Sequence, residues 1–121
     1  ILTCHDEYLL PTMFDVDGAL VGYGGLTPEP LIELIAAGKA KDYAKARAIH
    51  DRLLPVTKTV YHRGSHMEGT VALKHGLVTR GILEHATVRS PLLPLEPGAE
   101  IEIADALRSA GLVAAAKSQA A

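Results

Sequence analysis

The sequence has no tryptophan, one phenylalanine and one cysteine among its 121 residues, and aromatic residues make up only 4% of it. With so few rings, a hydrophobic core has to be built from Leu, Ile, Val and Ala side chains. The single cysteine, Cys4, excludes an internal disulfide. Because proteins of a reducing compartment seldom carry disulfides, we expect a cytoplasmic protein.

An excess of positive charge is also missing. The chain carries 12 basic and 14 acidic residues, interspersed along its length, for a net charge of −2. A general nucleic-acid-binding surface needs a basic excess, so that function class is excluded. No apolar run approaches the roughly 20 residues that span a bilayer, and we expect no membrane association.

The ends of the sequence differ in character. Neither a polar lead-in nor a signal peptide is present at the start, where Ile1 opens directly into an apolar stretch. We therefore expect residue 1 to lie inside a longer chain. Residues 113–121 are rich in alanine and predict a flexible C-terminal tail.

The first 38 residues predict two strand–helix units. Short apolar runs at 1–4 and 19–23 are typical of buried strands. Helical spacing predicts a short helix within 7–16 and a second helix over 27–38, closed by Gly38. Two strands joined by a helix form a parallel pair. Because a sheet of two strands leaves both edges unpaired, we expect further strands outside this sequence.

A long helix is predicted next, over 41–63. Its apolar residues recur at steps of three and four, and Pro55 should kink it. The stripe that this spacing predicts is Ala46, Ile49, Leu53, Val56 and Val60.

Two shorter helices are expected after it, so that residues 39–112 form a helical extension. The first covers 66–75, is closed by Gly76, and has a face made of Met67, Val71 and Lys74. The last covers 100–110, with a stripe of Ile103, Leu107 and Ala110. An extended connector between them is marked by Pro91, Pro94 and Pro97.

Several phrases occur in a recognisable order: Thr3-Cys4-His5-Asp6, Asp17-Gly18-Ala19-Leu20-Val21-Gly22, Leu53-Leu54-Pro55-Val56, Ala72-Leu73-Lys74-His75-Gly76-Leu77 and Arg89-Ser90-Pro91-Leu92-Leu93-Pro94. Over residues 1–112 they resemble the C-terminal part of the dihydrodipicolinate synthase and N-acetylneuraminate lyase family. The resemblance implies an α/β fold. Residues 1–38 would be the last two βα units of a (β/α)8 TIM barrel, and residues 39–112 its C-terminal helical extension.

The resemblance also implies a class I, Schiff-base-forming mechanism without a cofactor. A lysine amine attacks the ketone of a 2-keto acid, and the imine then acts as an electron sink. In the family this lysine lies on the sixth barrel strand, which the sequence does not contain. The lysines present fall on predicted helices, helix ends or the tail, so none is assigned as the nucleophile: Lys39, Lys41, Lys45, Lys58, Lys74 and Lys117. The implied partners are a 2-keto acid, the rest of the barrel and further copies in a homotetramer.

Two departures from dihydrodipicolinate synthase point to a branch of the family that acts on sugar acids. His5 stands where that enzyme usually has glycine, and Gly22-Tyr23 where it has a β-branched residue and serine. These phrases look closer to 2-keto-3-deoxy-L-arabonate dehydratases, which are hydro-lyases of pentose sugar-acid metabolism. An aldolase or synthase of the same family is the alternative.

The candidate site residues follow the predicted strands, because barrel active sites lie at the carboxyl ends of strands. His5 is the candidate acid or base and could bind a substrate hydroxyl; capping the next helix is the alternative. Cys4 is expected to be a small buried residue beside it. Gly22 either leaves room for a longer substrate or allows close backbone packing. Tyr23, which alone of the four tyrosines follows a predicted strand, either lines the pocket or fills the barrel rim.

Three other interpretations stay open. His62 and His66 have zinc-ligand spacing, but Gly64-Ser65 interrupts the helix between them, which favours solvated polar residues and no metal. The glycines at 22–25 could cradle a phosphate, although no Lys or Arg stands beside them. The chain could also be a non-catalytic helical interaction module, but such a module has no need of two buried parallel strands.

Overall fold

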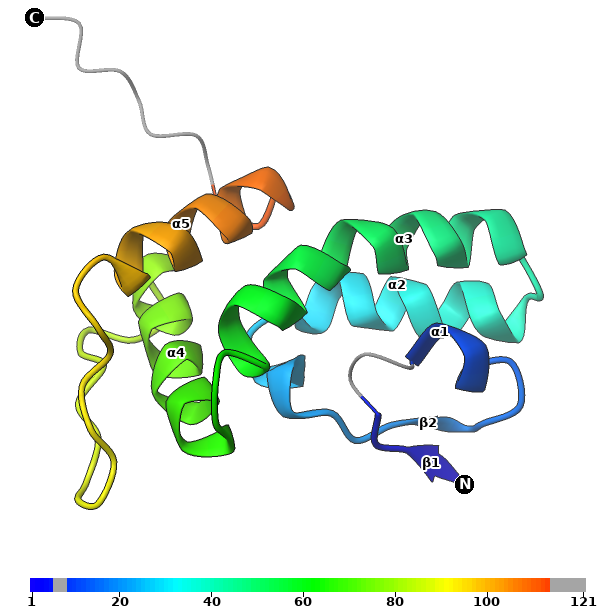
Figure 1. The fold of residues 1–121 in the computed structure, drawn as a ribbon. Helices are drawn as coiled ribbons and strands as arrows, with labels where there is room; N and C mark the ends of the chain where they lie inside the picture. The colour runs from blue at the N-terminus through cyan, green and yellow to red at the C-terminus, as the bar shows by residue number, and fades with distance from the viewer. Residues whose placement is uncertain (6–8, 114–121) are drawn as a thin grey trace, which may run out of the picture.

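The computed structural model describes residues 1–5 and 9–113 of the chain. Most of the predicted tail lies outside the described residues, and so does the start of the predicted first helix. The elements follow one another in the order β1 (Leu2–Thr3), α1 (Leu9–Thr12), β2 (Gly18–Ala19), the 3-10 helix η1 (Gly22–Gly25), α2 (Pro28–Lys39), α3 (Tyr43–Val56), the π-helix η2 (Thr57–Tyr61), α4 (His66–Thr79) and α5 (Ala99–Ser109) (Figure 1). No helix of the described part is long and apolar enough to cross a membrane.

β1 and β2 form a two-stranded parallel sheet, as predicted. Leu2 pairs with Gly18 and Thr3 with Ala19. The predicted strand over 19–23 is wrong in its extent. The amide of Leu20 still donates to the carbonyl of Thr3, at 2.8 Å, but β1 has no further paired residue to continue the ladder. The chain then turns into η1.

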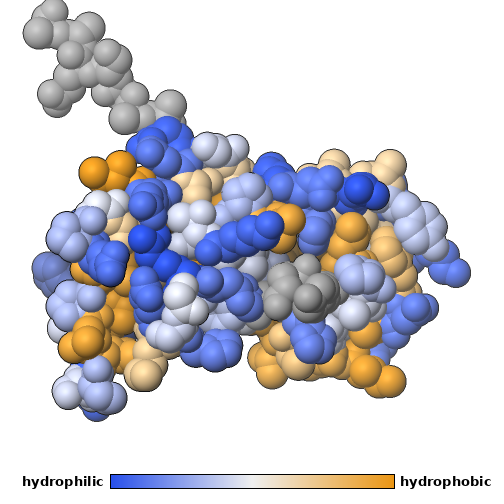
Figure 2. All heavy atoms as spheres, in the orientation of Figure 1, coloured by the Kyte–Doolittle hydropathy of each residue, from blue (hydrophilic) through white to orange (hydrophobic). Residues whose placement is uncertain are grey.

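The prediction that both strands are buried is also wrong for the described structure. Ile1, Leu2 and Leu20 are 88%, 61% and 72% exposed. The helices α1, α2 and α3 lie on one side of the strand pair and leave the other side open (Figure 1). Figure 2 shows apolar side chains gathered at the surface in this part of the molecule. Covering this apolar face would be strongly favourable, at roughly 25 cal/mol per Å².

The predicted stripe of the long helix is confirmed. Ala46, Ile49, Leu53, Val56 and Val60 are all buried, and they extend from α3 through η2. Pro55 has no amide hydrogen and cannot complete the helical hydrogen-bond ladder. The helix does not end there but widens into the π-helical turn of η2 two residues later. Such turns are a common response to a disturbed ladder.

Two cores result from this arrangement. The first lies between α1, α2 and α3, and the second between η2, α4 and α5. On α5, the predicted stripe of Ile103, Leu107 and Ala110 is confirmed. On α4, the predicted face is confirmed at Val71 and wrong at Met67, which is exposed, and the other buried residues of this helix are Gly69, Ala72 and Gly76.

Gly38 and Gly76 do not end their helices, as the sequence had predicted, but lie inside them. A Cβ on Gly38 would come within 3.0 Å of the side chain of Met13. A Cβ on Gly76 would come within 2.9 Å of the side chain of Leu26. Each glycine therefore permits a close approach in one of the two cores. The residue that turns the chain after α2 is Lys41, which has a φ of 56°.

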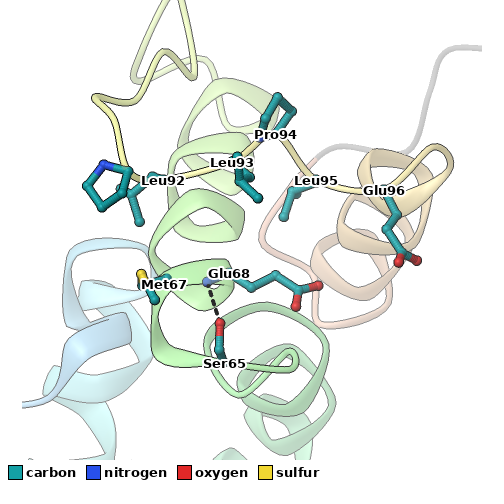
Figure 3. Close-up of a pocket in the computed structure, with 9 residues that line it drawn as sticks. Ser65, Met67, Glu68, Leu92, Leu93, Pro94, Leu95 and Glu96 are labelled. Atoms are coloured by element: carbon teal, nitrogen blue, oxygen red, sulfur yellow. Dashed lines mark hydrogen bonds between the residues drawn. The ribbon is translucent and has the colours of Figure 1, made fainter.

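The connector between α4 and α5 is extended, as the prolines predicted. Its residues Leu93 and Leu95 point toward the first turn of α4 (Figure 3). A hollow of about 330 Å³ lies between this connector and α4, lined by Ser65, Met67, Glu68 and residues 91–96.

Replacing Lys41 by glycine should stabilise the protein. The left-handed backbone at this position costs a non-glycine residue about 1–2 kcal/mol, part of which is offset by the greater freedom of glycine in the unfolded chain. We expect Lys41→Gly to raise the free energy of unfolding, measured with urea, by about 0.5–1 kcal/mol. The control is Arg52→Gly, on the exposed side of α3, which should lower it by about 1 kcal/mol. Equal losses in both variants would contradict the assigned backbone.

Candidate functional site

The carboxyl ends of β1 and β2 lie at one edge of the sheet, because the strands are parallel. Cys4 and His5 follow β1, and residues 20–22 follow β2. Both strands run toward η1 and the junction between η2 and α4 (Figure 1). The candidate residues of the two strands therefore share one side of the molecule. Cys4 is exposed, contrary to the expectation of a buried residue, because no described element covers it. His5 is exposed as well.

The end of β1 is fixed by α1. The buried hydroxyl of Thr3 shares a hydrogen bond of 3.0 Å with the hydroxyl of Thr12. This bond joins α1 to the strand immediately before Cys4 and His5.

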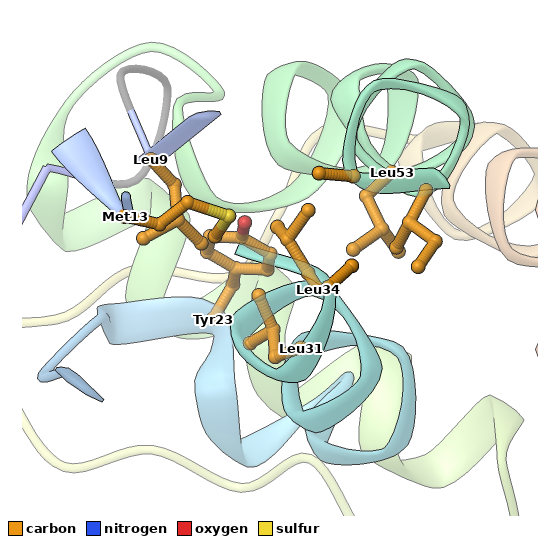
Figure 4. Packing of buried hydrophobic residues seen from close by; sticks show 9 residues of the cluster. Leu9, Met13, Tyr23, Leu31, Leu34 and Leu53 are labelled. Atoms are coloured by element: carbon orange, nitrogen blue, oxygen red, sulfur yellow. The ribbon is translucent and has the colours of Figure 1, made fainter. Parts of the chain in front are cut away.

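Tyr23 lies in the core and is only 2% exposed. Figure 4 shows its ring among Met13, Leu31 and Leu34. Its carbonyl accepts the amide of Leu26 at 2.9 Å, which closes η1. The two interpretations of Tyr23 were a pocket wall and the barrel rim; the described ring instead packs in the first core.

Gly22 lies directly beneath the ring of Tyr61. A Cβ on Gly22 would overlap the Cζ, Cε2 and hydroxyl atoms of that ring. Of the two interpretations of Gly22, close packing thus describes the geometry, and the space that a side chain would fill is occupied by Tyr61. Sequence reasoning missed Tyr61 because it treated only tyrosines that follow strands as candidates. A π-helical turn that redirects a side chain from a long helix leaves no clear pattern in the sequence.

Arg80 ties the end of α4 to the residues that follow η1. From the end of α4 it donates to the carbonyl of Leu26 and makes a bidentate pair with Glu29, at 2.8 and 3.2 Å. The hydrogen bond from Arg80 lowers the pKa of the Glu29 carboxyl. Glu29 also stands in the first turn of α2, where a negative charge is favourable.

Arg63 joins the three elements of the second core. Its Nη1 donates to Glu102 of α5 at 2.7 Å, and its Nε lies 3.3 Å from a carboxylate oxygen of Glu68 in α4. The guanidinium is largely buried, so this pair of acids compensates its charge. Arg63 thereby sets how η2 meets α4, two residues after Tyr61.

Two hollows of the described part hold no comparable arrangement. The hollow beside the connector has carboxylates but no basic side chain in its lining. A second one, lined by His75, Glu84, His85 and Glu100 among others, is wide open. In residues 1–5 and 9–113, no three His, Cys, Asp or Glu side chains are grouped so that they could hold a metal ion.

None of the described lysines stands at the carboxyl end of β1 or β2. Lys39 ends α2, and Lys74 of α4 donates to the carbonyl of Thr87 at 2.6 Å. Lys45 and Lys58 lie on helices, and Lys41 lies in the turn between α2 and α3. The helical placement predicted for Lys39, Lys45, Lys58 and Lys74 is confirmed, whereas Lys41 lies in a turn and not on the predicted helix.

Comparison with known proteins identifies relatives. The model of the dihydrodipicolinate synthetase family matches residues 1–110. The 4-hydroxy-tetrahydrodipicolinate synthase of Kineococcus radiotolerans is 42% identical over 82 residues, which are 68% of this chain and 26% of the relative. The enzyme of that name from Chlorobium phaeobacteroides is 30% identical over 114 residues, which are 93% of this chain and 37% of the relative. The chain thus spans about a third of the length of these relatives.

Solved structures of the same group share the fold. A crystal structure of a dihydrodipicolinate synthase matches with a TM-score of 0.77 and 23% identity, over 93% of this chain and 38% of that one. The dihydrodipicolinate synthase of Bacteroides thetaiotaomicron matches with a TM-score of 0.76 and 24% identity, over 88% of this chain and 36% of that one. These neighbours are TIM-barrel proteins, and the chain is a helix-rich α/β segment with the fold of part of such a protein.

Proposed function

We propose that this chain, which belongs to the dihydrodipicolinate synthetase family, supplies one wall of the active site of a Schiff-base-forming lyase. The observation that carries the proposal is the parallel pairing of β1 and β2, which brings Cys4, His5 and Gly22 to one edge. In barrels of this kind the carboxyl ends of the strands surround the substrate. The substrate is a 2-keto acid.

In this proposal, residues 1–38 are the last two βα units of the barrel and residues 39–112 its helical extension. The open apolar side of the strand pair supports this arrangement, because the remaining strands would cover Leu2 and Leu20. A shallow groove of about 240 Å³ continues that apolar surface along β2 and α2, with Ala19, Val21, Leu31 and Ile35 in its lining. The rest of the barrel is its natural occupant.

The nucleophile comes from outside this chain. A lysine amine has to be partly neutral to attack a ketone, which requires a desolvated position. The described lysines lie on helices and turns away from the strand ends. The chain alone should therefore be inactive, and its part in the chemistry is to bind and orient the 2-keto acid and to move a proton.

Two candidate reactions fit this role. The first is dehydration of a 2-keto-3-deoxy sugar acid such as 2-keto-3-deoxy-L-arabonate. His5 supports it, because an exposed imidazole at a strand end can give a proton to a departing hydroxide. The second is condensation with pyruvate, which is supported by the shared name of the relatives, 4-hydroxy-tetrahydrodipicolinate synthase. Both begin with the same imine, and a homotetramer is proposed for either.

Borohydride reduction in the presence of pyruvate tests whether a lysine forms an imine, which is the first step of both candidate reactions. In the intact protein that contains this chain, we expect one lysine to gain the mass of the reduced pyruvate adduct, in a peptide outside residues 1–121. Peptide mass spectrometry locates it. The chain expressed alone serves as the control and should gain no label. If the intact protein gains none either, the Schiff-base function is wrong.

Replacing His5 by alanine tests whether this residue, which follows β1, acts as the acid or base of the reaction. The substitution should lower kcat more than it lowers the urea midpoint of the intact protein. We expect kcat to fall by about 100-fold, the usual contribution of a general acid or base. His50→Ala in α3, far along the chain from the strand ends, is the control. A normal kcat in His5→Ala would reduce His5 to a structural role.

A further inference from the structure

We infer that Tyr61 of the helical extension contacts the substrate and recognises a hydroxyl group on the part of a 2-keto acid distal to its ketone. The inference rests on the proposed function and names one determinant of its specificity. It starts from the overlap between the ring of Tyr61 and the place of a Gly22 side chain. Gly22 follows β2, so the phenol lies at the carboxyl end of that strand.

The π-helical turn of η2 delivers Tyr61 to this place. The buried stripe of α3 continues through Val56 to Val60, and these two side chains face the second core. Tyr61 is the last residue of η2 and instead packs against the first core, next to η1. One side chain of the extension thereby reaches the strand ends.

Two glycines make room for Tyr61. Gly22 accommodates the ring, and a Cβ on Gly69 of α4 would overlap the carbonyl of Tyr61. The ring also meets the ring of His62 edge-on, with centroids 5.2 Å apart, and lies 6.3 Å from that of His66. Gly22 thus contacts the ring and Gly69 the backbone of Tyr61, which limits the movement of the phenol, as specific recognition requires.

The hydroxyl of Tyr61 is the polar group that this residue can offer to a ligand. In the part of the chain that the structure describes, the side chain is partly buried against the first core. A phenol donates one hydrogen bond and also accepts. A half-buried polar group loses free energy when it lacks a partner, so a hydroxyl-bearing ligand gains by supplying one.

The proposed site should bind a hydroxylated 2-keto acid more tightly than pyruvate. Pyruvate carries a ketone and a carboxylate but no hydroxyl, and the imine-forming lysine would engage its ketone. The phenol of Tyr61 lies over Gly22, just beyond β2, and the inference places the distal part of a longer substrate beside it. A site built to bind a substrate hydroxyl discriminates against an analogue that lacks it.

The test is Tyr61→Phe in the intact protein, which keeps the ring on Gly22 and removes only the hydroxyl. With a five-carbon hydroxylated 2-keto acid as the probe, we expect KM to rise about three- to tenfold, the loss of one hydrogen bond, while kcat changes less. Borohydride trapping with pyruvate should be unchanged. The control is Tyr43→Phe, because Tyr43 is exposed on α3 and packs against Phe14, and its KM should stay normal.

The outcomes separate the two proposals. If pyruvate traps a lysine but Tyr61→Phe has a normal KM, or the enzyme does not accept the hydroxylated acid, then the inference about Tyr61 is wrong and the lyase function stands. If no lysine is trapped in the unaltered protein, the lyase function itself fails.

A double-mutant cycle checks the geometry independently of activity. Gly22→Ala should push the ring aside, lower the urea midpoint of the intact protein and raise KM as Tyr61→Phe does. In a Tyr61→Ala background, where the ring is gone, the same Gly22→Ala change should lower the midpoint much less. Equal losses in both backgrounds would show that the two residues do not touch.

Discussion

The parallel pairing of β1 with β2 is the constraint on which the rest of the structure depends. Only two residue pairs make it, yet it sets the direction of both strands and brings their carboxyl ends to one edge. Thr12 of α1 holds the end of β1, and η1 turns the chain after β2. Neither strand has a partner on its outer edge among the described residues. The same feature that arranges the candidate site thus also leaves an apolar face uncovered.

The helical extension matters to that edge as much as the strands do. Arg80 holds the start of α2 through Leu26 and Glu29, and η2 brings Tyr61 over Gly22. Both contacts join the helical segment after α2 to the residues between β2 and α2. We therefore regard the helical segment as part of the proposed site, in which Tyr61 would recognise the substrate. The Schiff-base lysine would come from strands outside this chain.

The sequence predicted the fold where periodicity is a sufficient guide. The stripe from Ala46 to Val60 and that of α5 are buried as expected, because apolar spacing on a long helix reports directly on burial. The prediction from sequence failed at glycines, because a glycine can either end a helix or allow close packing inside one. Gly38 and Gly76 were interpreted as helix ends, but they lie inside helices where a neighbouring side chain needs their space. The contact between Tyr61 and Gly22 could not be predicted, because it joins residues far apart in the sequence.

A crystal structure of the intact protein, reduced with borohydride in the presence of pyruvate, tests the account most directly. We predict a reduced imine on a lysine outside residues 1–121. Its adduct should face the carboxyl ends of β1 and β2, with His5 and the hydroxyl of Tyr61 around the space beyond it. An adduct on a lysine of this chain, or one at the opposite ends of the strands, would contradict the account.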